Sequence, residues 1–394
     1  MRSLIALSSC FPHSYVAGRS SCAPDEFVIE NIRTRCGYPL KDVLREFKFN
    51  LEQTGSSHAA KCLHYTADLL CSGCLSPWKK FLWDFVFDHV GIGSPRVFLF
   101  LQKQFFTIEN QWNRYAHETC LRDSAFQKIC IECILVVRSC QRKPQIRVPR
   151  VPPETHNDDW VRKTTGQAPS SVALTRVFKP SHDLAILKPI GEDFCKAVSD
   201  GATQKALFWM KWCIEEDSRL KREHQGYGLS NLERGSATAS SKQKTHIGYF
   251  FILLLAELYK ELSAKGLIRM TEEYQGLLNL YMNPDSSMTG KRKQDTLILA
   301  IQIICEVPRW KVPAAPGLIT DPLQFKRALE HCGHFFQEVL AYDELKIDLE
   351  TEAKKIKVKE AQAKKLGSKK DKLSIINKQI DAYDKVLDDF MGFR

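Results

Sequence analysis

Residues 289–305 read Thr-Gly-Lys-Arg-Lys-Gln-Asp-Thr-Leu-Ile-Leu-Ala-Ile-Gln-Ile-Ile-Cys, and this stretch decides which fold to expect. Its apolar part, residues 296–305, predicts a buried helix. Lys291, Arg292 and Lys293 stand at the start of that helix, where the macrodipole is already positive and the first N–H groups lack partners. Each such charge costs about 0.3–1 kcal/mol, so the stretch predicts an anion site for a nucleic-acid phosphate or an acidic partner. The alternative is that the three side chains point into water.

Helical spacing of apolar residues extends outward from this stretch in both directions. Alternation with a period of two residues, which is typical of β-strands, is almost missing from the chain. The sequence therefore predicts an all-α fold of two helical halves. The expected units are a loose leader at 1–25, an N-terminal helical domain at 26–140, a Pro-rich basic linker at 141–189, a C-terminal helical domain at 190–342 and a Lys-rich helical hairpin or coiled coil at 343–394.

Local signals place several helix ends in the second half. Residues 199–201, Ser-Asp-Gly, predict a turn between two helices, the second with a large aromatic face. Thr245 is a candidate N-cap for the next helix, with Gly266 as its stop. Thr271, followed by two glutamates, predicts a capped helix start, because acidic residues suit the first turn of a helix.

Further cations lie in the linker and beside tryptophans. Repeated proline in 141–189 disfavours helix and favours an extended interdomain linker or an arm along the surface. A tryptophan next to Lys or Arg is typical of surfaces that stack bases and bind a phosphate backbone. Trp78 and Trp310 have such neighbours, but both would equally serve as core anchors near helix ends. With the opening triplet, the candidate nucleic-acid or anion contacts are Lys291, Arg292, Lys293, Arg309, Trp310, Lys311, Trp78, Lys79, Lys80, Arg142, Lys143 and Arg147.

The tail combines a heptad seam with a lysine cluster. Residues 344–366 favour helix, and Gly367-Ser368 separates them from a second arm. An antiparallel hairpin is favoured over a dimeric coiled coil, because about three heptads are marginal on their own. Nine lysines lie within 354–372, around the expected tip. The candidate oligomerisation residues follow a heptad spacing: Leu373, Ile376, Ile380, Tyr383, Leu387 and Phe390.

Composition points to an intracellular protein with polyanionic or acidic partners. The net charge is +11, and 44% of the residues are hydrophobic, so wholesale disorder is excluded. The 14 cysteines are scattered and several lie in apolar runs, which indicates a reducing compartment, the cytoplasm or nucleus. A mitochondrial presequence within 1–24 is the less favoured alternative. The longest apolar run, residues 249–256, is too short to span a bilayer, so no membrane segment is expected.

Motifs for catalysis, cofactors and metals are weak. Thr289-Gly290-Lys291 lacks the upstream glycine and following Ser or Thr of a phosphate-binding loop. The two CxxC pairs, in 71–74 and 130–133, lie much further apart than the pairs of a zinc ribbon. The carboxylate pair Asp84 and Asp88 fits a solvated helix face. We therefore expect no catalytic residues, no cofactor, no metal and no enzymatic activity.

A resemblance comes from residues 196–210, Lys-Ala-Val-Ser-Asp-Gly-Ala-Thr-Gln-Lys-Ala-Leu-Phe-Trp-Met. With the helices up to residue 305, the segment resembles the helical collar of sliding-clamp loaders and related AAA+ proteins. The AAA+ core with its Walker motifs is missing, so the resemblance implies an interaction or oligomerisation module and not a motor. The chain is also similar in general architecture to lineage-specific replication and virion proteins of large DNA viruses.

Two functions follow from these patterns. The first is a nonenzymatic, nucleic-acid-associated scaffold or replication accessory protein that binds polyanions through its basic patches. The second is a structural assembly protein, part of a virion or another large complex, whose basic patches meet acidic protein surfaces. In either case the C-terminal heptads offer a candidate surface for self-association.

Overall fold

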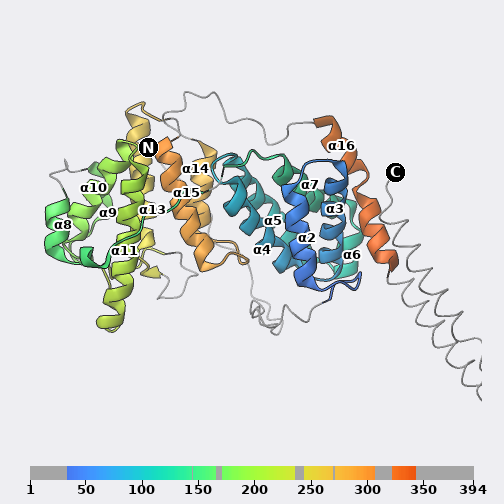
Figure 1. Cartoon of the computed structure of the whole chain (residues 1–394), viewed down its shortest axis with the longest axis horizontal. Helices are drawn as coiled ribbons and strands as arrows, with labels where there is room; N and C mark the ends of the chain where they lie inside the picture. Colours follow the sequence, from blue (N-terminus) through green and yellow to red (C-terminus); the bar gives the residue numbers. More distant parts are fainter. Residues whose placement is uncertain are drawn as a thin grey trace, which may run out of the picture.

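The computed structural model describes residues 33–143, 145–165, 171–235, 244–268, 271–306 and 322–342. All regular elements in these ranges are helices, and the few backbone bridges between extended residues are isolated, so the all-α prediction is confirmed. Figure 1 shows two groups of helices side by side, with α14 and α15 adjoining α4 and α5 where the groups meet. The predicted leader at 1–25 and the tail at 343–394 lie outside the described residues.

The N-terminal half is a bundle in which α2 packs on α3, and α7 packs on both α3 and α5. Asp123 begins α7 as an N-cap, because its side chain accepts a hydrogen bond of 2.9 Å from the Ala125 N–H. The α4 helix continues directly into a π-helical turn, η1. In chain order the elements are α2 (Leu40–Glu52), α3 (Ser56–Cys71), α4 (Leu75–Phe85), η1 (Val86–Val90), α5 (Arg96–Arg114), α6 (His117–Arg122) and α7 (Ser124–Ser139).

The second half follows most of its local signals. Gly201 has φ +69° in the predicted turn between two helices, and Gly266 has φ +70° just after the predicted helix end. Thr271 caps its helix as expected by accepting from the Tyr274 N–H at 3.4 Å. Thr245 does not act as a cap, since its helix begins at Gly248. The elements are α10 (Leu187–Ser199), α11 (Thr203–Glu223), α13 (Gly248–Ala264), α14 (Glu272–Met282) and α15 (Gly290–Glu306).

The stretch predicted as a linker is part of the packed body. It runs extended near its start and then forms η2 (Pro153–Thr155), α8 (Asp158–Thr164) and α9 (Val172–Val177). Helix α9 packs along α13 and against α10. The prolines permit these short helices, and the apolar residues between them are buried, namely Val161, Ala173, Leu174 and Val177. Proline spacing alone did not reveal this burial.

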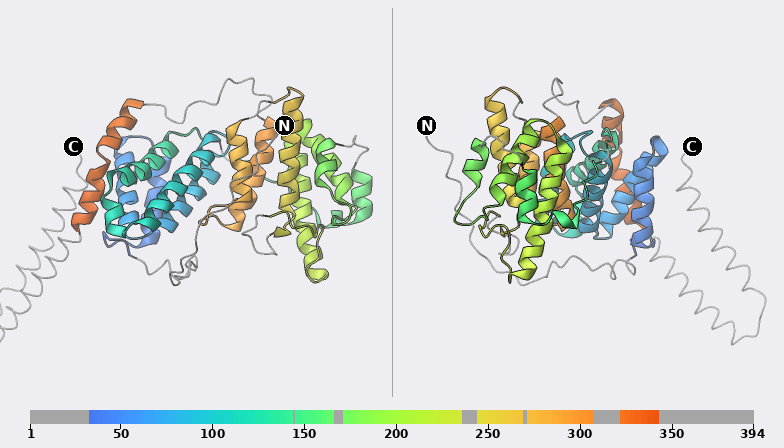
Figure 2. Two further views of the ribbon diagram at one scale, coloured as in Figure 1. Left: turned by 180° about the vertical axis from the view of Figure 1, so that it is seen from behind. Right: turned by 60° about the vertical axis from the view of Figure 1, so that its left-hand side comes forward.

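The chain returns to the N-terminal half after α15. Helix α16 (Pro322–Glu330), with the helical residues that follow up to 342, lies against α7 and not against α15. The left view in Figure 2 shows this segment on the outer side of the N-terminal bundle. Residues 322–342 therefore pack with the first half of the chain, although the sequence grouped them with the second.

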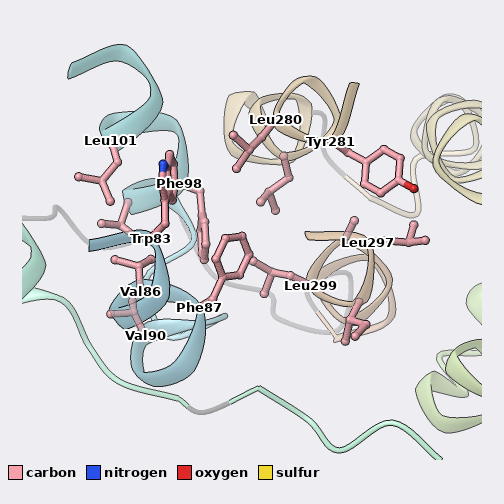
Figure 3. Close-up of a cluster of buried hydrophobic side chains, with 14 of the residues drawn as sticks. Trp83, Val86, Phe87, Val90, Phe98, Leu101, Leu280, Tyr281, Leu297 and Leu299 are labelled. Carbon is pink, nitrogen blue, oxygen red and sulfur yellow. The ribbon is translucent and has the colours of Figure 1, made fainter. Parts of the chain in front are cut away.

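A buried apolar cluster joins the two halves (Figure 3). Trp83, Phe87 and Phe98 lie on one side of it, and Phe87 projects toward Leu299 of α15. The rings of Phe87 and Phe98 have centroids 4.9 Å apart. Helix α14 approaches α5 closely at Gly276, where an added Cβ would stand 3.0 Å from Leu99. The two bundles therefore share one continuous core.

Phe87→Ala tests whether this cluster holds the halves together. Phe87 is 1% exposed, so truncation leaves a cavity and should lower the free energy of unfolding by about 3–5 kcal/mol. Urea denaturation followed by circular dichroism measures the loss. Phe106→Ala is the matched control, because Phe106 is 68% exposed and should change stability by about 0.5 kcal/mol or less. Equal effects of the two substitutions would contradict a shared core.

Candidate functional site

The start of α15, where the sequence predicted an anion site, holds an ion cluster between the two halves, in which Arg292 and Asp295 are buried and Asp84 and Asp88 reach the surface. The Arg292 guanidinium donates to Asp84 at 2.6 Å, to both oxygens of Asp88 at 2.7 and 2.8 Å, and to Asp295 at 2.8 Å. Asp84 belongs to α4 and Asp88 to η1, whereas Asp295 follows Arg292 by three residues in α15. The anions that this helix start attracts are thus carboxylates of the same chain.

Because Arg292 and Asp295 are shielded from water, the pKa of each depends strongly on the charged groups around it. The side chains of Arg292 and Asp295 are 7% and 8% exposed. Burial alone would lower the pKa of the Arg292 guanidinium, but its hydrogen bonds to Asp88 and Asp84 outweigh this and raise the pKa. For Asp295, burial dominates and raises the carboxyl pKa above its usual value, despite the hydrogen bond from Arg292. Arg292 was predicted to bind a phosphate, but its hydrogen-bonding groups are taken up by carboxylates of the same chain, so it is an internal ion-pair partner.

The π-helical turn presents the acidic side of the cluster. Asp84 lies in the last turn of α4 and Asp88 in η1, and both reach Arg292. The turn ends at Gly91, which has φ +49°. A Cβ there would stand 2.5 Å from the Lys143 carbonyl oxygen, so the position requires glycine. Single π-helical turns are rare and frequently lie at functional sites.

A second buried cation ties α4 to the loop after α14. The Lys79 ammonium, 1% exposed, pairs with Glu109 of α5 and with Asp285 at 2.8 Å. It also lies 5.3 Å from the centre of the Phe105 ring. Trp78 is fully buried and packs on Phe105, so Trp78 and Lys79 do not form an exposed base-stacking pair. The core-anchor interpretation of Trp78 is the correct one.

Lys293 faces aromatic rings. Its ammonium donates to the Tyr249 hydroxyl at 2.6 Å and lies 4.2 and 5.0 Å from the centres of the Tyr249 and Tyr281 rings. These contacts tie α15 to α13 and α14 by hydrogen bonding and by cation–π attraction. Lys293 is therefore engaged inside the second half. Its neighbour Lys291 is exposed.

The remaining predicted cations in the described ranges lie on or near the surface. Lys80 pairs with Asp84 at 2.8 Å, and Lys143 pairs with Glu306 at 2.9 Å. Arg142 donates to the backbone oxygens of Leu51 and Glu52. Arg147 is exposed. The structure does not gather these residues around one site. Arg309, Trp310 and Lys311 lie outside the described residues, as do the six heptad residues from Leu373 to Phe390, and their roles stay predictions.

The sequence did not reveal which carboxylates pair with these cations. Arg96 of α5 pairs with Glu273 of α14, which adds another ion pair between the halves. The spacing of Asp84 and Asp88, four residues apart beside apolar Phe85 and Val86, was the available signal, because it places both carboxylates on one helix face. Nothing in the sequence indicates that this face meets a residue 208 positions away.

Cysteines and metals add no second site in the described ranges. Every cysteine there is buried, and burial raises the pKa of several of these thiols, for example that of Cys62 to about 11 and that of Cys140 to about 12. These thiols are therefore protonated at neutral pH. Among the described residues, His, Cys, Asp and Glu form no group of three or more that could hold a metal ion. No described helix has both the length and the apolar character needed to cross a membrane.

Comparisons with protein-family models, with curated proteins and with solved structures gave no match. The resemblance of residues 190–305 to the collar of clamp loaders thus stays a prediction. The class that the fold itself defines is an all-α protein whose two halves are joined by ion pairs and a shared apolar core.

Arg292→Gln should destabilise the protein by about 3 kcal/mol or more, because buried Asp295 and its neighbours lose their counter-charge. Lys291→Gln, at the exposed neighbouring position, should have little effect. Chemical denaturation of both variants measures the difference. Adding Asp295→Asn, which removes the buried carboxylate, to Arg292→Gln should recover part of the loss. Wild-type stability of Arg292→Gln would show that the cluster does not hold the halves together.

Acid should weaken the contact between the halves. Burial opposes ionisation of Asp88 and Glu273, but the hydrogen bonds from Arg292 and Arg96 prevail and lower both pKa values below the usual 3.8 and 4.5. A depressed pKa in the folded state gives stability that is present above the unfolded-state pKa and lost as pH falls through the folded-state pKa. Urea midpoints between pH 7 and pH 3 should therefore drop below about pH 4.5, the ordinary Glu value. Arg292→Gln should flatten this drop, and an unchanged pH profile in that variant would contradict the assignment.

Proposed function

We propose that this chain is a nonenzymatic structural assembly protein, a rigid helical body on which partners dock in a fixed relative orientation. The observation that carries the proposal is that cations predicted to bind polyanions form ion pairs inside the molecule instead. Arg292 and Lys79, which the sequence offered to polyanions, are almost fully buried against carboxylates of the same chain. Binding a phosphate through either would require breaking the contact between the halves.

The arrangement of ion pairs supports a rigid body. The first half contributes Lys79, Arg96 and Lys143 to carboxylates of the second half, and the second half contributes Arg292 to carboxylates of the first. Charges of both signs thus lie on each side of the boundary. Sliding one half past the other would separate these pairs and leave the buried charges of Lys79, Asp285 and Arg292 without compensation, which costs several kcal/mol. A body of fixed shape suits a component that sets the spacing between its partners.

A second candidate is association with nucleic acid through segments outside the buried clusters. The nine lysines in 354–372 are accompanied by two acidic residues, Glu360 and Asp371, so this segment is strongly basic in sequence. Exposed Lys291 and Arg147 offer further contacts on the body. In this case the helical body positions the basic segment and does not itself bind the phosphates. An intracellular, reducing location fits both candidates.

A salt titration separates the two. Fluorescence anisotropy with labelled random single- and double-stranded oligonucleotides gives the dissociation constant at several salt concentrations. An assembly protein should show no binding tighter than about 10⁻⁴ M near physiological salt, the weak limit of non-specific binding. Tighter binding with a steep log–log slope would favour the second candidate.

Two variants locate any binding that appears. One replaces the nine lysines of 354–372 with Gln, and the matched control replaces Lys291 and Arg147 with Gln. Loss of both affinity and slope in the first variant alone assigns binding to the lysine segment. Tight binding that survives in both variants would place phosphate contacts elsewhere on the helical body and would contradict the assembly proposal.

A further inference from the structure

An open hollow of about 470 Å³ lies on the N-terminal bundle, where α3 ends and α6 begins. It is lined by residues 33–35, which precede α2, by residues 71–73 and by His117. Its volume is within the range of about 300–1,000 Å³ that is typical of small-molecule sites. None of its lining residues belongs to α4, η1 or α15, so the hollow is separate from the ion cluster at Arg292.

The lining of the hollow carries positive charge. Arg33 and Arg35 contribute two guanidinium groups, and His117 adds a third charge when it is protonated. Among the residues that the structure describes, no Asp or Glu lines the hollow. Asp68 is fully buried beside it, where it accepts from the Cys36 N–H at 3.1 Å, and its single charge offsets only one guanidinium. The hollow therefore favours an anion.

Hydrogen bonds hold the segment that carries the arginines in place. Arg33 and Pro39 form an isolated antiparallel bridge, and the Arg33 side chain donates to the Gly37 carbonyl oxygen at 2.8 Å. The Arg35 N–H donates to the Ser72 hydroxyl at 2.7 Å. The segment is thus tied both to itself and to the end of α3. Groups that are already placed cost less to order when a ligand binds.

The end of α3 opposes an anion less than an uncapped helix end would. The Leu70 carbonyl oxygen accepts from the Gly73 N–H at 3.0 Å, and the His117 Nε2 lies 3.2 Å from the same oxygen. The Asp68 carbonyl oxygen accepts from both the N–H and the hydroxyl of Ser72, at 3.0 and 2.5 Å. Because these carbonyl groups have donors, less unpaired negative charge faces the hollow.

Thr34 gives a second, independent sign of a ligand. It is 5% exposed, and its hydroxyl has no hydrogen-bond partner in the part of the chain that the structure describes. A buried hydroxyl without a partner lowers stability, so such groups are uncommon in folded proteins. Thr34 lines the hollow, and rotation about its χ1 bond to another staggered position lets the hydroxyl donate to an oxygen bound there.

We propose that the hollow binds the phosphoryl group of a small phosphorylated molecule. The forked guanidinium of Arg33 can meet two phosphoryl oxygens, and the Thr34 hydroxyl can donate to a third. A carboxylate has only two oxygens, which one guanidinium satisfies, and would leave Thr34 without a partner. The volume of the hollow leaves room for the rest of the molecule. The inference goes beyond the proposed assembly function and does not depend on it.

The test uses the full-length protein with pyrophosphate as the probe and citrate as the carboxylate comparison, at constant ionic strength. Isothermal titration calorimetry should give a dissociation constant below about 1 mM for pyrophosphate and clearly weaker binding of citrate. Hydrogen exchange read by mass spectrometry localises the binding, because pyrophosphate should slow exchange of amides in residues 33–39 and 70–74.

Two variants remove one ligand contact each. Arg33→Gln and Thr34→Val should each weaken pyrophosphate binding by about tenfold or more, because each removes hydrogen bonds to a charged group. Thr34→Val has a similar shape and loses a hydroxyl that has no partner in the free protein, so its urea midpoint should not fall. This variant therefore separates loss of binding from loss of folding.

Arg45→Gln is the matched control, since it removes the same charge from a side chain that is 69% exposed and does not line the hollow. It should leave pyrophosphate binding almost unchanged. Equal losses in Arg33→Gln and Arg45→Gln would mean general charge attraction and would overturn the site. Citrate binding as tight as pyrophosphate binding, or no protection of residues 33–39 and 70–74, would overturn the phosphoryl assignment as well.

Discussion

The contact between Arg292 and the carboxylates of Asp84, Asp88 and Asp295 is the constraint on which the rest of the structure depends. A guanidinium 7% exposed at the positive end of a helix is costly unless anions surround it. Those anions lie on α4 and η1, so the cost is offset when the two halves meet in one orientation. Asp84 at the end of α4 and Asp88 in η1 both reach Arg292 in that orientation.

The apolar and charged parts of the boundary have different roles. The cluster around Phe87 supplies burial, which is non-directional and would tolerate several orientations of the two bundles. The ion pairs fix one orientation, because they alternate in sign across the boundary and pair at hydrogen-bonding distances. Lys79 and Arg292 contribute more to the choice of orientation than to the sum of stabilising free energy, since buried ion pairs gain little over apolar packing.

Local patterns predicted helices well and predicted their contacts poorly. The Thr271 cap, the turn at Gly201 and the helix stop at Gly266 depend on residues a few positions apart, so the sequence shows them directly. The unfavourable charges at the start of α15 were also visible, and the structure pairs one of them, Arg292, with carboxylates of the same chain. The source of those carboxylates was not visible, because hydrophobic periodicity says which face of a helix is buried and not which helix buries it. The same limit explains the two misassigned segments. Residues 141–189 carry apolar side chains too widely spaced for a periodic signal, and the partner of residues 322–342 lies far back in the chain.

The contacts of Arg292 join residues that are far apart in the sequence, and this separation has a consequence for synthesis of the chain. Asp84 and Arg292 are separated by 208 positions, so the first bundle leaves the ribosome well before the helix that completes it. At about 5–20 residues per second, the face around Phe87 waits on the order of 10–40 s for its counterpart. During that interval an apolar surface is open to the surrounding solution, and the Asp88 carboxylate beside it lacks its partner on α15. Transiently exposed apolar surface makes incomplete chains prone to aggregation, so this face is where the growing chain needs protection until α15 has been made.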